Sequence, residues 1–334
     1  MAEHTVAIYH VEQALQGALR RGVAAAPLLE RAGIPPALLD APLARVSQAQ
    51  YGALLRLLRR RLRDEFFGLL DRPLPLGCFA QCCRLLVRAP TLGDALRDGL
   101  RFFHGLIDAF TPRLHIEGEM ACLAIVPHDP EDRSHRYGQR SFLFFAFGLA
   151  SWLAARRIPL AGVEYRDPSS PRGADTDRVF QTHVLYGRPQ YRLWFEARWL
   201  ALPQVQNEPS LREFLRDAPT NLLVRYRDRT RATDRLRRLL HSRLHDELPS
   251  LEQVAKELAL TPQTLSRRLR EEGHSFQALK DDVRRDAAIA LLQRPDLTLV
   301  DVAAGVGFSE ASTFHRAFKK WTGVAPGEYR QRVR

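Results

Sequence analysis

The chain has few cysteines, and they lack the pattern of a metal or redox site. Its 334 residues include four cysteines and no Cys-x-x-Cys pair; they are Cys78, Cys82, Cys83 and Cys122. A protein of the reducing cytosol does not form structural disulfides. The first three fall on one expected helix, where cysteine usually packs as a small buried apolar residue. Redox sensing and metal binding are the alternatives for them.

The sequence also lacks a long apolar run and a leader pattern. The longest strongly apolar stretch, residues 142–155, has 14 residues, whereas a helix needs about 20 to cross a bilayer. The first residues do not follow the basic-then-apolar order of a signal peptide. No Ser/His/Asp set, phosphate-binding glycine loop or metal-ligand spacing occurs in the sequence. We therefore expect a cytoplasmic protein without membrane association, cofactor, metal or enzymatic activity.

Positive charge is concentrated toward the C-terminus. The formal net charge is +12, and residues 221–334 supply +7 of it, with 22 basic and 15 acidic side chains. Such a basic region suits a polyanionic partner, although charge alone does not separate DNA from RNA or an acidic membrane. The length suggests two domains, and 45% hydrophobic residues are enough for a core in each.

An internal repeat lies within residues 251–329. Apolar residues with the i, i+3, i+4, i+7 spacing of one helix face occur twice, 48 positions apart. The two sets are Leu251, Val254, Ala255, Leu258 and Leu299, Val302, Ala303, Val306. Ser250 and Thr298 stand before the two helices as N-caps, and Ser250 with Gln253 has the residues of a capping box. Because a turn follows each helix, the repeat predicts two helix-turn-helix units in tandem.

Each unit continues into a second helix after its turn. We expect these helices at residues 262–272 and 310–322. Their N-caps and stops are Thr261, Ser309, Gly273 and Gly323. A long helix at residues 276–292 joins the units, and its length would separate the two second helices by roughly one DNA turn of ~34 Å.

Both second helices combine an apolar face with a polar one. The apolar faces hold Leu265, Leu269, Ala311, Phe314, Phe318 and Trp321. The polar faces hold Gln263, Thr264, Ser266, Arg267 and Arg270 in the first unit and Ser312, Thr313, His315, Arg316, Lys319 and Lys320 in the second. Arginine can bond guanine, glutamine can bond adenine, and lysine or hydroxyl groups can hold phosphates. A basic helix face is often merely solvated, but two copies at a fixed offset favour DNA recognition.

The second unit resembles the DNA-binding domain of the AraC/XylS family of bacterial transcription regulators. The matching residues are Val302, Ala303, Gly307, Phe308, Ser309, Ser312, Phe314, Arg316, Phe318, Lys319, Gly323, Pro326, Tyr329 and Arg330. The resemblance implies that two recognition helices enter successive major-groove segments of double-stranded promoter DNA. By motif position, Gln263, Ser266 and Arg267 would contact DNA in the first unit, and Ser312, Thr313 and Arg316 in the second. It also implies RNA polymerase as a partner.

The first 200 residues alternate helices with short strands. Helices are expected near residues 1–31, 47–66, 76–87, 92–110 and 142–155, and strands at residues 113–117, 121–126, 160–166 and 191–196. This order predicts an α+β domain over residues 1–205, not an all-β barrel, and the resemblance implies that this domain is regulatory. A linker at residues 206–231 and an all-α DNA-binding domain with two tandem helix-turn-helix units at residues 232–334 complete the chain. Residues 29–34 and 91–103 are similar to a helix-rich sensor found in a subset of the same family, which implies effector binding or a homodimer.

The resulting expectation is a sequence-specific transcription regulator, an activator controlled by a small metabolite. His104 and Asp108 are the effector candidates because they are spaced one helical turn apart beside Phe102, Phe103 and Phe110; a hydrogen-bonded structural pair is the alternative. Three other functions stay open. They are a DNA-binding module fused to an enzyme, for which the cysteine spacing fits a zinc site poorly, a non-specific architectural or RNA-binding protein, and an effector-independent regulator whose first domain only dimerises.

Overall fold

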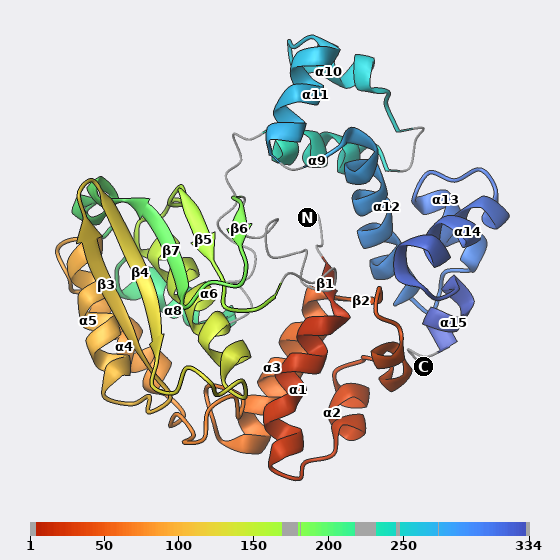
Figure 1. The fold of residues 1–334 in the computed structure, drawn as a ribbon. Coiled ribbons are helices and arrows are strands. Elements are labelled where there is room, and N and C mark those ends of the chain that lie inside the picture. Colours follow the sequence, from red (N-terminus) through yellow and green to blue (C-terminus); the bar gives the residue numbers. More distant parts are fainter. Residues whose placement is uncertain are drawn as a thin grey trace. The chain divides into compact units, whose positions relative to one another are not determined.

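The structure is a computed structural model of the chain and describes residues 5–168, 180, 182–217, 232–244, 248–272 and 274–331. Its contacts divide the chain into two compact units (Figure 1). Unit 1 comprises residues 1–12, 25–54 and 228–334, and unit 2 comprises residues 13–24 and 55–227. Among the described residues, every helix is too short or too polar to cross a bilayer.

Unit 2 is built on a five-stranded sheet with the order β3-β4-β7-β5-β6 (Figure 1). The strands are β3 (Phe110–Glu117), β4 (Met120–Pro127), β5 (Gly162–Glu164), β6 (Val184–Leu185) and β7 (Tyr191–Glu196). Neighbours run antiparallel except β5 and β6, which are parallel. Gly118, with a φ of 59°, permits the tight turn of the β3–β4 hairpin. The predicted strand pair is confirmed, and strands that are far apart in the sequence share one sheet.

Helices supply the second layer of unit 2. They are α4 (Cys78–Leu86), α5 (Leu92–His104), α6 (Arg136–Leu153), α8 (Glu208–Asp217) and the 3-10 helix η3 (Ala197–Ala201). Helix α5 packs on β3, and α6 packs on β4 and β7. Thr91 is the N-cap of α5, since its hydroxyl accepts a hydrogen bond from the Asp94 backbone N–H at 3.2 Å. Helix α5 ends earlier than predicted because the chain turns at Gly105 to enter β3.

Unit 1 combines segments from both ends of the chain. From the N-terminal part come β1 (Thr5–Ala7), α2 (Ala25–Arg31), η1 (Pro36–Asp40) and β2 (Arg45–Ser47); helices α1 (Ile8–Arg20) and α3 (Gln48–Leu62) cross the unit boundary. From the C-terminal part come α9 (Ala232–Ser242), α10 (Leu251–Glu257), α11 (Pro262–Glu271), α12 (Phe276–Leu292), α13 (Leu299–Gly305), α14 (Ala311–Thr322) and α15 (Pro326–Gln331). The helical prediction for residues 1–31 is therefore confirmed for Ile8–Arg20 and Ala25–Arg31 and wrong for Thr5–Ala7. Thr5–Ala7 is a strand because it pairs with distant Arg45–Ser47, which local periodicity does not reveal.

The β1–β2 pair packs on the C-terminal helices within unit 1. The Thr5 hydroxyl donates to the Asp286 carboxylate of α12 at 2.6 Å, and the Tyr329 hydroxyl of α15 donates to the Arg45 carbonyl at 2.6 Å. The Gln293 amide also donates to Gln50 at 2.9 Å. The packing of unit 1 therefore does not follow the sequence order that the predicted domains assume.

The predicted linker, residues 206–231, is described only in part. Residues 208–217 form α8, whose Phe214 ring stacks on Trp152 of α6 with centroids 4.2 Å apart. This segment thus packs into unit 2 as a helix. Residues 218–231 lie outside the described part of the chain.

Candidate nucleic-acid interface

The first helix-turn-helix unit consists of α10 and α11. The predicted capping box is confirmed: Ser250 Oγ accepts from the Gln253 N–H at 3.3 Å, and Gln253 Oε1 accepts from the Ser250 N–H at 2.7 Å. Thr261 caps α11 by accepting from the Thr264 N–H at 3.1 Å, and Pro262 occupies the first helical turn. These local bonds satisfy backbone donors that a helix start leaves unpaired.

The apolar sides of α10 and α11 close a core with the preceding helix. Val254, Ala255, Leu265 and Leu269 are buried, and α9 adds Leu236, Leu240 and, just after it, Leu244. Glu272 joins α11 to α9 because its carboxylate accepts the N–H groups of Ala232 and Thr233 at the start of α9. The polar side of α11 is thereby turned away from this core. The helix stop expected at Gly273 lies outside the described residues.

The second helix-turn-helix unit consists of α13 and α14. It repeats the first helix-turn-helix unit, with one difference. Thr298 and Asp301 form a capping box on α13, and Gly323 ends α14 with a φ of 78°. Ser309, however, is not the N-cap of α14. The turn after α13 extends through Glu310, which holds the N-cap position without a side-chain cap bond. The Glu310 carboxylate instead accepts the Ser312 hydroxyl at 3.3 Å.

The apolar stripe of α14 is narrower than predicted. Phe314 and Phe318 are buried, with ring centroids 5.6 Å apart, but Ala311 in the first turn is exposed. Trp321 is only half-buried and lies at the edge of the core, 6.0 Å from the Phe308 ring. The core of the second helix-turn-helix unit therefore depends on the middle of α14.

The predicted polar residues of α11 lie on its outer side. Gln263, Arg267 and Arg270 are exposed, and Thr264 and Ser266 are half-buried. Arg267 pairs with Glu271 one turn later at 3.7 Å, with both side chains largely exposed. Such a surface pair contributes little to stability, so Arg267 can exchange Glu271 for another anion at little cost.

All six predicted residues of α14 are exposed: Ser312, Thr313, His315, Arg316, Lys319 and Lys320. Within the described residues, the side chains of Arg316, Lys319 and Lys320 form no ion pair or hydrogen bond. The helix has no acidic residue to neutralise them. This side of α14 thus presents a surface suited to anions.

Helix α12 joins the two helix-turn-helix units and has the predicted bounds, residues 276–292. Leu279 and Val283 are buried, whereas Phe276, Ala287 and Leu291 are only partly buried. Two buried acidic residues share this helix. Asp282 binds Arg237 of α9 at 3.1 Å and Arg285 at 2.9 Å, and Asp286 binds Arg285 and Thr5. The 282/286 spacing of one helical turn was the only sequence signal for this network.

Arg284 contacts the turn before α14, which no local sequence pattern indicates. Its guanidinium donates to the Gly307 carbonyl at 3.1 Å and lies 4.6 Å from the centroid of the Phe308 ring. Burial lowers the pKa of Arg284, so this cation is held in a partly desolvated place. Arg284 thereby connects α12 to the turn that leads into α14.

The effector candidates His104 and Asp108 do not form the expected pair. Helix α5 ends at His104, so Asp108 is not on the same helix. Both residues are exposed, and Asp108 lies 4.0 Å from Arg72. All four cysteines are buried and free, and no group of three or more His, Cys, Asp or Glu residues in the described part of the chain could hold a metal ion.

Comparisons with known proteins cover both halves of the chain. Residues 22–204 match a family described as the arabinose-binding domain of AraC transcription regulator, and residues 254–332 match a helix-turn-helix domain. An ornithine utilization regulator of Pseudomonas aeruginosa is 26% identical over 98% of this chain and 96% of its own. An uncharacterized HTH-type transcriptional regulator of Mycobacterium tuberculosis is 30% identical over 97% of this chain and 96% of its own.

Among solved structures, the transcriptional regulator CdpR from Pseudomonas aeruginosa covers 97% of this chain and 98% of its own, with 19% identity and a TM-score of 0.33. The family matches explain the arrangement described above, a mixed α/β part followed by two capped helix-turn-helix units. They also exclude the fused-enzyme alternative, since the matched family consists of transcription regulators. The chain therefore belongs to the AraC family of DNA-binding transcription regulators.

Proposed function

We propose that this regulator activates transcription from specific promoters by inserting α11 and α14 into the DNA major groove, under the control of a small molecule bound by its N-terminal part. The supporting observation is the exposed polar side of both helices, each of which follows a capped helix and a turn. A helix in this setting is the element that reads base edges in helix-turn-helix proteins.

The side chains divide by reach and chemistry. Arg316, in the middle of α14, and Gln263 with Arg267 on α11 are assigned to base edges. Lys319 and Lys320, one turn later on α14, are assigned to phosphates. The shorter or flanking polar side chains complete the phosphate and sugar contacts: Thr264, Ser266, Arg270, Ser312, Thr313 and His315.

Helix α12 sets the spacing of the two contacts. Its 17 residues make it about 25 Å long at 1.5 Å per residue. We infer that the two recognition helices reach major-groove segments about one turn of ~34 Å apart.

Selection from a random duplex library tests the DNA-binding proposal. The full chain should enrich sequences with two short conserved elements whose centres lie about 10 base pairs apart. A chain with Arg316→Ala should lose preference within one element only, which makes it the matched control. Absence of enrichment over bulk DNA would favour the architectural alternative and reject sequence-specific regulation.

The remaining partners follow from an activator's role. We propose contact with RNA polymerase in the cytoplasm and a homodimer formed through the N-terminal part. Transcription in vitro from an enriched site, with and without the chain, measures activation directly. Sedimentation of the full chain measures dimerisation. A cell extract supplies small molecules that a defined buffer lacks. If the chain dimerises and regulates transcription equally well in both, the effector-independent alternative is favoured.

The predicted boundaries, with regulation in residues 1–205, a linker at 206–231 and DNA binding in 232–334, are part of this proposal. A fragment of residues 221–334 should fold and keep its DNA preference. It should be less stable than the full chain because it loses the contacts of Thr5 and Arg45 with α12 and α15. An unfolded fragment would show that the DNA-binding part requires the N-terminal strands.

A further inference from the structure

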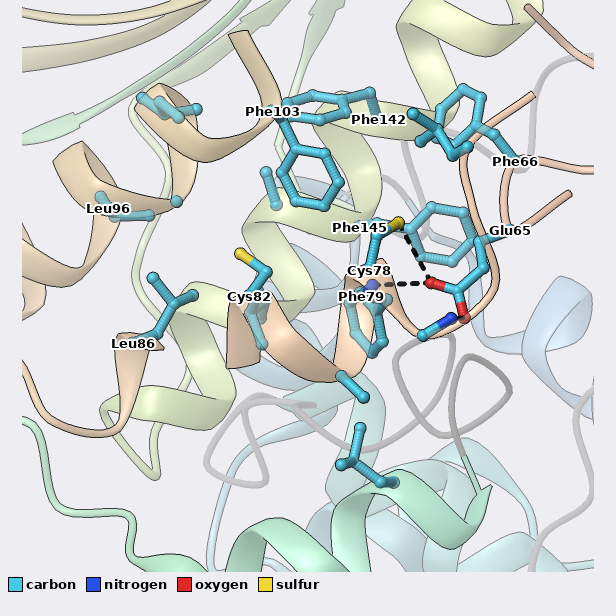
Figure 2. Close-up of a pocket in the computed structure, with 18 of the residues that line it drawn as sticks. Glu65, Phe66, Cys78, Phe79, Cys82, Leu86, Leu96, Phe103, Phe142 and Phe145 are labelled. Carbon is cyan, nitrogen blue, oxygen red and sulfur yellow. Dashed lines mark hydrogen bonds between the residues drawn. The ribbon is translucent and has the colours of Figure 1, made fainter. Parts of the chain in front are cut away.

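Unit 2 contains a cavity of about 210 Å³ among α4, α5 and α6 (Figure 2). Its walls come from α3 to α6, from the loop before α4 and from Leu215 of α8. Aromatic rings form much of the lining, including Phe103, Phe142 and Phe145. His104 and Asp108 are not among the lining residues, so the cavity is separate from the effector candidates predicted from the sequence.

The acidic group of the cavity is already satisfied by the protein. Glu65 Oε1 accepts the Gly77 N–H at 2.8 Å, and its Oε2 accepts the Phe79 N–H at 2.6 Å and the Cys78 thiol at 3.3 Å (Figure 2). These donors lie at the start of α4, where the helix dipole also favours a negative charge. Glu65 therefore serves as an anchor for α4 and has no need of a cationic ligand.

The thiols in the cavity wall are neutral. Burial raises the pKa of Cys78 and of Cys82 to about 12, so neither forms a thiolate at physiological pH. A neutral thiol is a weak hydrogen-bonding group and behaves largely as an apolar surface. The other charged lining residue, Arg59, is half-buried and not enclosed.

We propose that this cavity is the effector site and that the effector is a small, mainly apolar molecule with an aromatic or branched hydrocarbon core. The inference rests on the proposed function, in which the N-terminal part senses a small molecule. The proposed effector differs in chemistry from arabinose, which the description of the matched family names, and from ornithine, which the name of one relative contains.

Size and polarity both support this class of ligand. An engineered apolar cavity of ~150 Å³ binds benzene, so about 210 Å³ admits a somewhat larger hydrocarbon. A sugar or an amino acid would bring hydroxyl, ammonium or carboxylate groups against phenylalanine and leucine side chains. Each polar group left without a partner there would oppose binding.

Thermal unfolding of the full chain with indole as the probe tests the proposal, with arabinose and ornithine as comparison ligands. Indole at about tenfold its Kd should raise the Tm by roughly 3–6 °C, and the polar ligands should leave it unchanged. Ala146→Phe adds a ring inside the cavity and should abolish the indole shift. Ala201→Phe adds the same ring at an exposed position of η3 and should retain it.

Thiol protection provides a readout that does not depend on the folding of a variant. At pH 9, where a small fraction of thiolate forms when the cavity opens, bound indole should slow the reaction of Cys78 and Cys82 with methyl methanethiosulfonate by severalfold, as followed by mass spectrometry. Cys122 is buried in β4, outside the cavity lining, so its rate reports general stabilisation of the fold and should fall less.

Three results would overturn the proposal. A Tm shift with arabinose or ornithine but not with indole would reject the apolar class. Unprotected cavity thiols would reject the site, and so would an indole shift that Ala146→Phe leaves intact. None of these results affects the duplex selection, so a failure here is distinguishable from a failure of the DNA-binding proposal.

Discussion

Replacing Arg284 by methionine should weaken DNA binding without touching the exposed side of α14. Arg284 donates to the Gly307 carbonyl at 3.1 Å and lies 4.6 Å from the Phe308 ring centroid. A hydrogen bond from a charged group contributes about 1.5–3 kcal/mol, and a cation–π contact of this kind about 0.5–2 kcal/mol. The cost of partly burying the guanidinium opposes both terms.

The net effect of Arg284→Met is therefore an expected loss of about 1–3 kcal/mol in the free energy of unfolding of unit 1. Methionine keeps most of the aliphatic stem, so the change tests the guanidinium more than the packing. Because the turn at Gly307 and Phe308 leads into α14, its release should also weaken binding to a cognate duplex by roughly fivefold to thirtyfold.

Arg294→Met is the matched control. Arg294 follows the end of α12 and pairs with Asp296 at 2.6 Å, and both side chains are 58% exposed. Such an exposed pair contributes little to stability, so stability and DNA affinity should change little. Urea unfolding followed by circular dichroism and fluorescence anisotropy with a labelled duplex measure the two effects. Equal DNA affinity for both variants would refute the positioning role of Arg284.

Three further predictions follow from the same structure. Arg316→Ala should reduce the free energy of binding to a cognate duplex by about 1–3 kcal/mol, and to a scrambled duplex by less. Lys320→Ala should weaken binding to both duplexes equally and reduce the slope of log affinity against log salt by about one. Fluorescence anisotropy across a salt series separates the two variants. Thr261→Ala removes the N-cap of α11 and should destabilise the first helix-turn-helix unit by about 1 kcal/mol in urea unfolding. Burial raises the pKa of Cys82 from 9.0 to about 12, so its contribution to stability is complete below pH 9 and declines toward pH 12. The difference in unfolding free energy between the wild type and Cys82→Ala across this range should therefore shrink with rising pH.

The tandem helix-turn-helix units were predictable because their signals are local. The capping partners Ser250 and Gln253 are three residues apart, and the apolar stripe of each helix repeats within two turns. The prediction failed at Ser309 for the same reason. A serine before a helix resembles an N-cap in any local window, but the turn after α13 extends one residue further, to Glu310.

The strand pair of unit 1 was not predictable from local patterns. Thr5–Ala7 is too short for a periodic signal, and its partner lies 40 residues away. The cavity was hidden for a related reason, since its lining combines segments from Arg59 to Leu215. In the sequence, Phe103 stands out only as a neighbour of His104, and Phe145 falls within the apolar run of residues 142–155. Only their packing leaves space between them. Glu65 carried no signal either, because its role depends on N–H groups 12 and 14 positions later.

The two recognition helices differ in how available their basic groups are. Helix α11 carries Glu271, which pairs with Arg267 at 3.7 Å, so an approaching phosphate must displace one carboxylate and is repelled by it. Helix α14 has no acidic residue, and its basic side chains make no ion pair within the described part of the chain. Counterion release, and with it the salt dependence of binding, should therefore draw fully on the basic side chains of α14 and on exposed Arg270 of α11, and less on Arg267. Gln263 adds hydrogen bonds to α11 that depend on base identity more than on ionic strength.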